Sequence, residues 1–198
     1  MKNQKQSPKI EAPNREERIL FHCCCAPCSG GIITLLEESG IRPTVLFFNP
    51  NIQPEAEYNL RKQTLTKFLT RKNIPFIDSD YDPQPWFDLM QGMENEPQRG
   101  KRCFECFKMR LEYSARLAKE RGFNVLSSSF GISRWKDMDQ VNSAGNEAAR
   151  EHGIIYWDYN WRRKGGQDLM RRVTREQNFY QQTYCGCKYS RRISTENL

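Results

Sequence analysis

Apolar residues follow two patterns along the chain: short continuous runs, and longer segments in which they recur every three or four positions. The runs predict buried strands and the recurring pattern predicts helices, because these spacings match the two kinds of element. The predicted strands cover residues 19–22, 44–48, 75–78, 124–128 and 154–157. The predicted helices cover residues 30–39, 55–71, 85–93, 103–122, 139–152 and 169–177. Strands that alternate with helices are typical of a parallel sheet flanked by helices, so we predict a Rossmann-like α/β fold.

The chain length of 198 residues suits one domain with a sizeable core. Residues 1–18 are polar and lack the apolar stretch of a signal peptide, so we expect a disordered lead-in there and a single domain over residues 19–198. No apolar run approaches the roughly 20 residues that a membrane-spanning helix needs. We therefore expect a cytoplasmic protein with no membrane partner.

The positive charge is concentrated near the C-terminus. Residues 161–192 contain nine Lys and Arg against Asp168 and Glu176, which accounts for the whole formal charge of +7. The same stretch holds five aromatic residues, Trp161, Phe179, Tyr180, Tyr184 and Tyr189. Cations that neutralise phosphates and rings that stack on bases suit an RNA partner, so we predict a basic C-terminal extension that binds RNA. A solvated basic face is the alternative.

The eight cysteines fall into three groups: Cys23, Cys24, Cys25 and Cys28; Cys103 and Cys106; Cys185 and Cys187. The first group lies in a predicted strand-to-helix turn, where ligands bind in open α/β sheets. The second group lies in the first turn of a predicted helix, whose free N–H groups favour a thiolate. In a reducing compartment such thiols are typical of metal binding or catalysis rather than of disulfides.

Three kinds of thiol site fit this pattern to different degrees. Zinc held by Cys25, Cys28, Cys103 and Cys106 would leave four thiols unexplained, and its two pairs are farther apart than in zinc ribbons. A thioredoxin-like dithiol at Cys25 and Cys28 explains one pair only. An iron–sulfur cluster beside a second thiol centre uses nearly all the cysteines. Next to a basic surface, such a redox site suggests reduction of a group within RNA.

Ser29-Gly30-Gly31 after the first strand offers another interpretation, because it is similar to the ATP-binding loop of tRNA thiolases. That loop has an Asp-Ser pair where this chain has Ile33 and Thr34. Without those polar groups near phosphate and Mg²⁺, we interpret the glycines as helix-start geometry. An iron–sulfur tRNA thiolase and a zinc-stapled RNA-binding domain remain the alternatives.

Five motifs together resemble one family, the cobalamin-independent epoxyqueuosine reductases (QueH). They are His22-x-Cys24-Cys25-Ala26-Pro27-Cys28, Phe48-Asn49-Pro50-Asn51-Ile52, Glu57-Tyr58-x-x-Arg61, Arg102-Cys103-x-x-Cys106-Phe107-x-x-Arg110-Leu111 and Tyr184-Cys185-Gly186-Cys187. The resemblance runs from about residue 19 to residue 190. It implies a fold similar to the nucleotide α-hydrolase type. It also implies the reduction of epoxyqueuosine to queuosine at the tRNA wobble position.

The resemblance also implies roles for individual cysteines. Cys24, Cys25, Cys103 and Cys106 would hold a [4Fe-4S] cluster, with no cobalamin and with electrons from an external donor. Cys185 and Cys187 would form a second centre, either a redox-active dithiol/disulfide or ligands of an additional mononuclear iron that Cys28 completes. Cys23 is expected to be a spare thiol, unless a register step exchanges it with Cys24.

Opening an epoxide also needs a proton donor. The candidates are His22, Tyr58, Asp80 and Asp82, each of which has a structural alternative as a packed or turn-forming residue. Arg61 and Arg134 are candidates for binding phosphate, with a surface position as the alternative. Asn49 and Asn51 are candidates for binding the substrate's polar ring.

Overall fold

The computed structural model describes residues 9–190 and contains a five-stranded sheet in the order β3-β2-β1-β4-β5. The strands are β1 (Arg18–His22), β2 (Arg42–Phe47), β3 (Phe76–Asp78), β4 (Val125–Ser128) and β5 (Ile155–Tyr156). All four pairings are parallel. The strand order reverses between β1 and β4, and ligands of open α/β sheets bind outside the carboxyl ends of the strands at such a point. The predicted α/β fold is confirmed.

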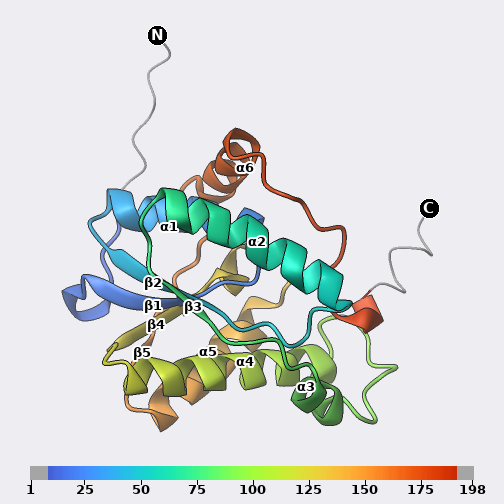
Figure 1. The fold of residues 1–198 in the computed structure, drawn as a ribbon. Coiled ribbons are helices and arrows are strands. Elements are labelled where there is room, and N and C mark those ends of the chain that lie inside the picture. The colour runs from blue at the N-terminus through green and yellow to red at the C-terminus, as the bar shows by residue number, and fades with distance from the viewer. Residues whose placement is uncertain (1–8, 191–198) are drawn as a thin grey trace.

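Helices cover both faces of the sheet (Figure 1). On one face lie α1 (Ala26–Glu38), α2 (Glu55–Arg71) and α6 (Gly166–Glu176). On the other lie α4 (Lys101–Glu120), α5 (Met138–Glu151) and the short α3 (Gln84–Leu89). Three 3-10 helices complete the secondary structure of the described residues: η1 (Pro13–Arg15), η2 (Ser129–Ile132) and η3 (Lys188–Ser190). In the part of the chain that is described, no helix has the length and apolar character to cross a membrane.

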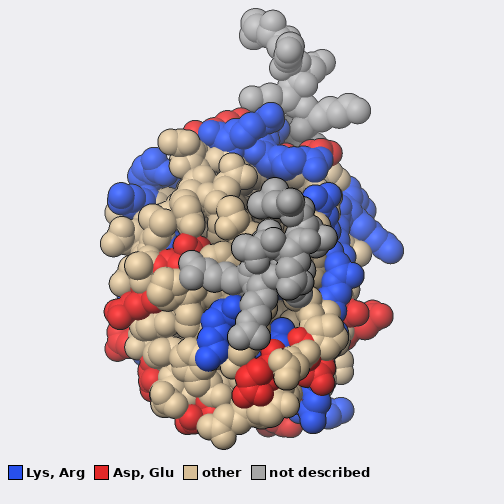
Figure 2. Space-filling view, turned by 90° about the vertical axis from the view of Figure 1, so that its right-hand side faces the viewer, with Lys and Arg blue, Asp and Glu red and all other residues tan. Residues whose placement is uncertain are grey.

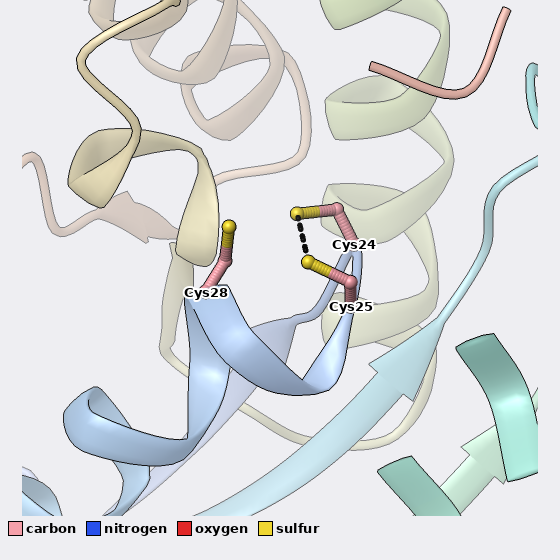
Figure 3. Close-up of side chains that lie close together, drawn as sticks. All are labelled: Cys24, Cys25 and Cys28. Atoms are coloured by element: carbon pink, nitrogen blue, oxygen red, sulfur yellow. Dashed lines mark hydrogen bonds between the residues drawn. The ribbon is translucent and has the colours of Figure 1, made fainter. Parts of the chain in front are cut away.

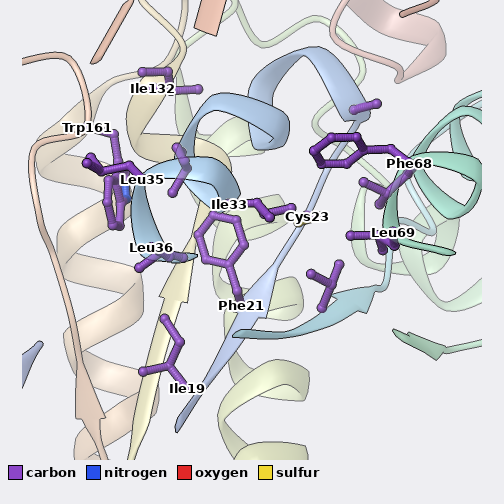
Figure 4. Close-up of a cluster of buried hydrophobic side chains, with 14 of the residues drawn as sticks. Ile19, Phe21, Cys23, Ile33, Leu35, Leu36, Phe68, Leu69, Ile132 and Trp161 are labelled. Atoms are coloured by element: carbon purple, nitrogen blue, oxygen red, sulfur yellow. The ribbon is translucent and has the colours of Figure 1, made fainter. Parts of the chain in front are cut away.

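Alternation along β1 divides the core into two layers. Ile19 and Phe21 pack with Ile33 and Leu36 of α1, whereas Leu20 packs with residues of α4 and α5 on the other face. Figure 4 shows the first layer, with Cys23 among these apolar side chains. Successive strand residues point to opposite faces, and Cys23 extends the side of Ile19 and Phe21.

Helix α1 begins earlier than predicted, and its glycines have another role. Pro27 lies in the first turn, where its fixed φ suits a helix start, so Cys28 is already helical. Gly31 faces α6 instead of shaping the helix start: a Cβ there would lie 2.8 Å from the backbone of Met170. The two glycines therefore let the basic C-terminal helix approach α1 closely.

The predicted lead-in and basic extension both reach beyond the described residues. Residues 1–8, and Arg191 and Arg192 of the basic stretch, lie outside them. Residues 9–17 differ from the expected disorder. Ala12 is 5% exposed, and the N–H of Ile10 donates to Ser39 Oγ at 3.1 Å. The apolar side chains of this polar segment dock on the end of α1, which its overall composition does not reveal.

Candidate cysteine centre

The turn between β1 and α1 brings three thiols together. The Sγ atoms of Cys24, Cys25 and Cys28 lie within 4.8 Å of one another, and 3.8 Å separates those of Cys24 and Cys25. Figure 3 shows the three sulfurs pointing into one space. Ser129 fixes the turn to η2, because its hydroxyl accepts from the N–H of Cys24 at 3.0 Å and donates to Cys24 Sγ at 3.3 Å. Three converging sulfurs are a ready set of metal ligands.

These three thiols share protons unequally. Hydrogen bonds from Cys25 and Cys28 lower the pKa of Cys24, with Lys136 and Ser129 acting in the same direction against burial. The hydrogen bond to Cys24 raises the pKa of Cys25 to about 12. The hydrogen bonds of Cys28 to Cys24 and Cys25 raise the pKa of Cys28 as well. Cys24 is therefore the most acidic thiol of the three. A thiophilic metal replaces such protons when it binds.

The other four site cysteines gather beside this turn. Cys103 Sγ accepts from the N–H of Arg99 at 3.3 Å. Burial raises the pKa of Cys103, and negative charge at Cys185 and Cys106 adds to this rise. Burial and the charge at Cys185 likewise raise the pKa of Cys187 to about 11. Cys103, Cys106, Cys185 and Cys187 are thus electrostatic neighbours, although they lie outside the tight group of Cys24, Cys25 and Cys28.

Arg61 joins the C-terminal segment to the rest of the site. Its guanidinium donates to the carbonyl of Cys185 at 3.0 Å, to the carbonyl of Tyr184 at 3.2 Å and to Glu57 at 2.7 Å. Nearby, Gln182 Nε2 donates to Cys25 Sγ at 2.9 Å. Arg61 is 2% exposed, so it anchors the segment and is not available to a phosphate.

Two further cations face the sulfurs. Arg110 is 2% exposed, its Nη1 lies 4.0 Å from Cys106 Sγ, and its guanidinium lies 4.4 Å from the Phe130 ring centroid. Among residues 9–190, no carboxylate pairs with Arg110, and its Nε has no hydrogen-bond partner. Burial acts to lower the pKa of Lys136, but negative charge at Cys185, Cys24, Cys28 and Cys25 outweighs it and raises that pKa. Buried cations of this kind suit an anionic group held by thiolates.

Comparison with known proteins identifies the family. The family model described as epoxyqueuosine reductase QueH matches residues 19–193. The chain belongs to the QueH family. The epoxyqueuosine reductase QueH of Histophilus somni is 51% identical over 186 residues, which cover 93% of this chain and 76% of the relative. That of Acinetobacter baylyi is 51% identical over 185 residues, 93% and 85% of the two chains. The QueH protein of Thermotoga maritima is 28% identical over 176 residues, 87% and 89% of the two chains.

The family model and the relatives confirm the resemblance to QueH and make the protein an oxidoreductase of the QueH kind. The cysteines of this QueH chain are all free thiols in the structure. Cys23 lies apart from the other seven, in the apolar core beside α1 (Figure 4). Burial raises its pKa.

The structure places the four predicted proton donors in different environments, and sequence reasoning missed Lys136, a cation whose pKa the nearby thiols raise. His22 is fully buried, its Nε2 lies 3.0 Å from the Phe48 carbonyl, and burial with Arg110 nearby lowers its pKa to about 3. It is therefore neutral near pH 7. Tyr58 packs in the core, and burial raises its pKa. Asp80 is exposed, as is Asp82, which accepts from the N–H of Gln84 at 3.1 Å at the start of α3.

The predicted ligand Asn49 has a structural role. Its amide donates to the Cys23 carbonyl at 2.9 Å, and its Oδ1 accepts from Arg110. Arg110 is part of a motif named in the sequence analysis, but no role was predicted for it there. Arg110 lies four residues after Cys106 and therefore on the same side of α4.

Proposed function

We propose that this protein reduces epoxyqueuosine in tRNA to queuosine. The observation that carries the proposal is a QueH-family chain in which three thiols, Cys24, Cys25 and Cys28, converge after β1 of a parallel sheet. Opening the epoxide to an alkene consumes two electrons and two protons and releases water. An external donor supplies the electrons.

We assign the [4Fe-4S] ligands to Cys24, Cys25, Cys103 and Cys106, and the second centre to Cys185 and Cys187, completed by Cys28. The second centre is either a redox dithiol or a mononuclear iron site. The close approach of Cys28 to Cys24 and Cys25 supports a second centre directly beside the first. When bound, the cluster supplies electrons one at a time. A rival ligand set, in which Cys28 itself holds the cluster with Cys24 and Cys25, predicts a different mutant phenotype.

Arg110 and Lys136 have complementary tasks in this proposal. Buried Arg110 balances the charge of the thiolates, which would otherwise be costly in the interior. Lys136 is half-buried on the loop after η2, near enough to the thiols that their negative charge raises its pKa. A cation in that place stabilises the negative charge that develops on the epoxide oxygen.

The tRNA backbone is proposed to cross the side of the molecule on which the C-terminal segment ends. Figure 2 views that side and shows Lys and Arg across its upper and right-hand parts, with Asp and Glu mostly lower and to the left. The loop before α6 and α6 itself carry four exposed cations, Arg163, Lys164, Arg171 and Arg175. A tRNA substrate is consistent with a cytoplasmic enzyme.

The proposal is tested by mixing anaerobically prepared, chemically reduced protein with epoxyqueuosine-containing tRNA and analysing the nucleosides. We expect queuosine to form; its absence with an iron- and sulfide-loaded preparation contradicts the proposed function. Iron analysis of Cys28→Ala tests the ligand assignment. A variant that keeps the [4Fe-4S] absorption supports the second-centre role of Cys28, and loss of the cluster favours the rival set. Colourless wild-type protein with stoichiometric zinc contradicts the cluster itself.

A further inference from the structure

Trp135 is the feature that the proposed mechanism leaves unexplained. It is 68% exposed, whereas the other three tryptophans, Trp86, Trp157 and Trp161, are buried. An isolated exposed apolar residue is ordinary. The position of this ring, the way its loop is fastened and the charges around it are what single it out.

The loop that carries Trp135 is held by arginines on both sides. Arg99 donates from Nε to the Trp135 carbonyl at 3.1 Å and from Nη2 to the Arg134 carbonyl at 3.0 Å. Arg162 donates to the carbonyl of Lys136 at 3.0 Å and to that of Ser133. The Arg134 guanidinium lies 5.0 Å from the centroid of the indole ring. A fixed backbone therefore presents the ring to solvent.

The same loop borders the cysteine centre. The main-chain N–H of Arg99, whose side chain holds Trp135, donates to Cys103 Sγ. Ser129, shortly before the loop, bonds to Cys24, and Lys136, directly after Trp135, faces the sulfurs. One short loop thus turns an ammonium toward the thiols and an indole toward solvent. The exposed indole is therefore carried by a loop that adjoins the thiols.

We propose that Trp135 is a stacking platform for an unpaired base next to the modified nucleoside, with Arg134 at the adjoining phosphate. This inference rests on the proposed function, which makes a tRNA loop the substrate. Sequence-tolerant recognition of unpaired RNA combines an aromatic face for the base with cations for the backbone. Arg99, Arg134 and Arg162 give the surroundings of Trp135 a positive charge that suits RNA rather than a basic protein partner.

Fluorescence of the loaded protein tests this directly, because the exposed indole is the one that an RNA base reaches. The probes are an anticodon stem–loop carrying epoxyqueuosine and a fully paired RNA duplex of equal length. The difference in emission between wild type and Trp135→Phe removes the contributions of the buried indoles and the cluster. We expect saturable quenching of that difference by the stem–loop and little by the duplex.

Affinity supplies the second arm. Stacking is worth about 1–3 kcal/mol per base, so Trp135→Ala should weaken stem–loop binding about 5- to 150-fold, and Trp135→Phe should retain most of it. Arg134→Ala should also weaken stem–loop binding, and its matched charge control, Arg121→Ala, should leave binding unchanged. Arg121 is exposed at the end of α4. This end of α4 leads into the start of β4, so it lies at the amino ends of the strands, whereas the cysteine turn lies at their carboxyl ends.

Two results would overturn the platform. One is wild-type affinity in Trp135→Ala. The other is a defect in Trp135→Ala that appears only when a protein reductase, and not a chemical reductant, supplies electrons; this would assign the ring to a redox partner. Because both arms measure binding, a wild-type protein that binds the stem–loop without forming queuosine would refute the proposed function and leave the platform standing.

Discussion

Arg61→Met should release the C-terminal segment that carries Cys185 and Cys187 from the rest of the centre. The guanidinium of Arg61 makes two hydrogen bonds to this segment, at the carbonyls of Tyr184 and Cys185. Hydrogen bonds from charged donors contribute about 1.5–3 kcal/mol each. The carbonyls are partly exposed and regain water, so we take the lower end, about 3 kcal/mol for the pair. At about 1.4 kcal/mol per factor of ten, local opening should become about 100-fold more frequent.

Hydrogen–deuterium exchange over residues 183–190 measures this opening without any need for activity. Arg61→Lys should rescue little, because one ammonium cannot reproduce the planar fork that reaches Glu57 and both carbonyls. Arg116→Met is the control: Arg116 is 50% exposed and pairs on the surface with Glu120 at 2.7 Å, so its loss should change exchange in this segment negligibly. Wild-type exchange over residues 183–190 in Arg61→Met would refute the anchoring role.

Three further substitutions test other parts of the centre. Gly186→Ala should destabilise the same segment by about 1–3 kcal/mol, because Gly186 has φ +127° and a Cβ would lie 3.0 Å from Ile52 Cγ1. Faster alkylation of the buried Cys187 thiol reports this, and an unchanged rate contradicts it. Lys136→Met should lower the single-turnover rate about 100-fold with tRNA affinity nearly unchanged, and an equal loss in both would instead indicate a binding role. Arg110→Met should reduce iron retention more than it lowers the melting temperature of the metal-free protein; equal melting losses with and without metal would show that Arg110 only supports packing.

The layered fold could be predicted from the sequence because each strand and helix carries its own local signal. The alternation along β1 also predicts that the Cys23 side chain is buried, because Cys23 continues the side of Ile19 and Phe21 into the core. The start of α1 was predicted late because the paired glycines suggested a helix start, while Pro27 already supplies one. Local patterns therefore specify elements well and helix starts less well.

The grouping within the centre was harder to predict, because it depends on contacts between distant segments. Arg61 meets carbonyls more than 120 positions away, and nothing in its own helix indicates that partner. Cys28 joins Cys24 and Cys25 because α1 starts early enough to turn its sulfur back toward theirs. Nothing in the local sequence distinguishes Lys136 from other loop residues. Its importance follows from the fold, which brings it near the thiols of the β1–α1 turn and Cys185.

The most direct test of a thiol centre that reduces epoxyqueuosine compares two cysteine variants with wild type in one nucleoside assay. Each protein is prepared anaerobically, reduced chemically and mixed with epoxyqueuosine-containing tRNA. Cys23→Ala removes a core thiol and should keep its iron and form queuosine, whereas Cys103→Ala should lose both. Queuosine formation by Cys103→Ala, or none by a fully iron-loaded wild type, would contradict the account.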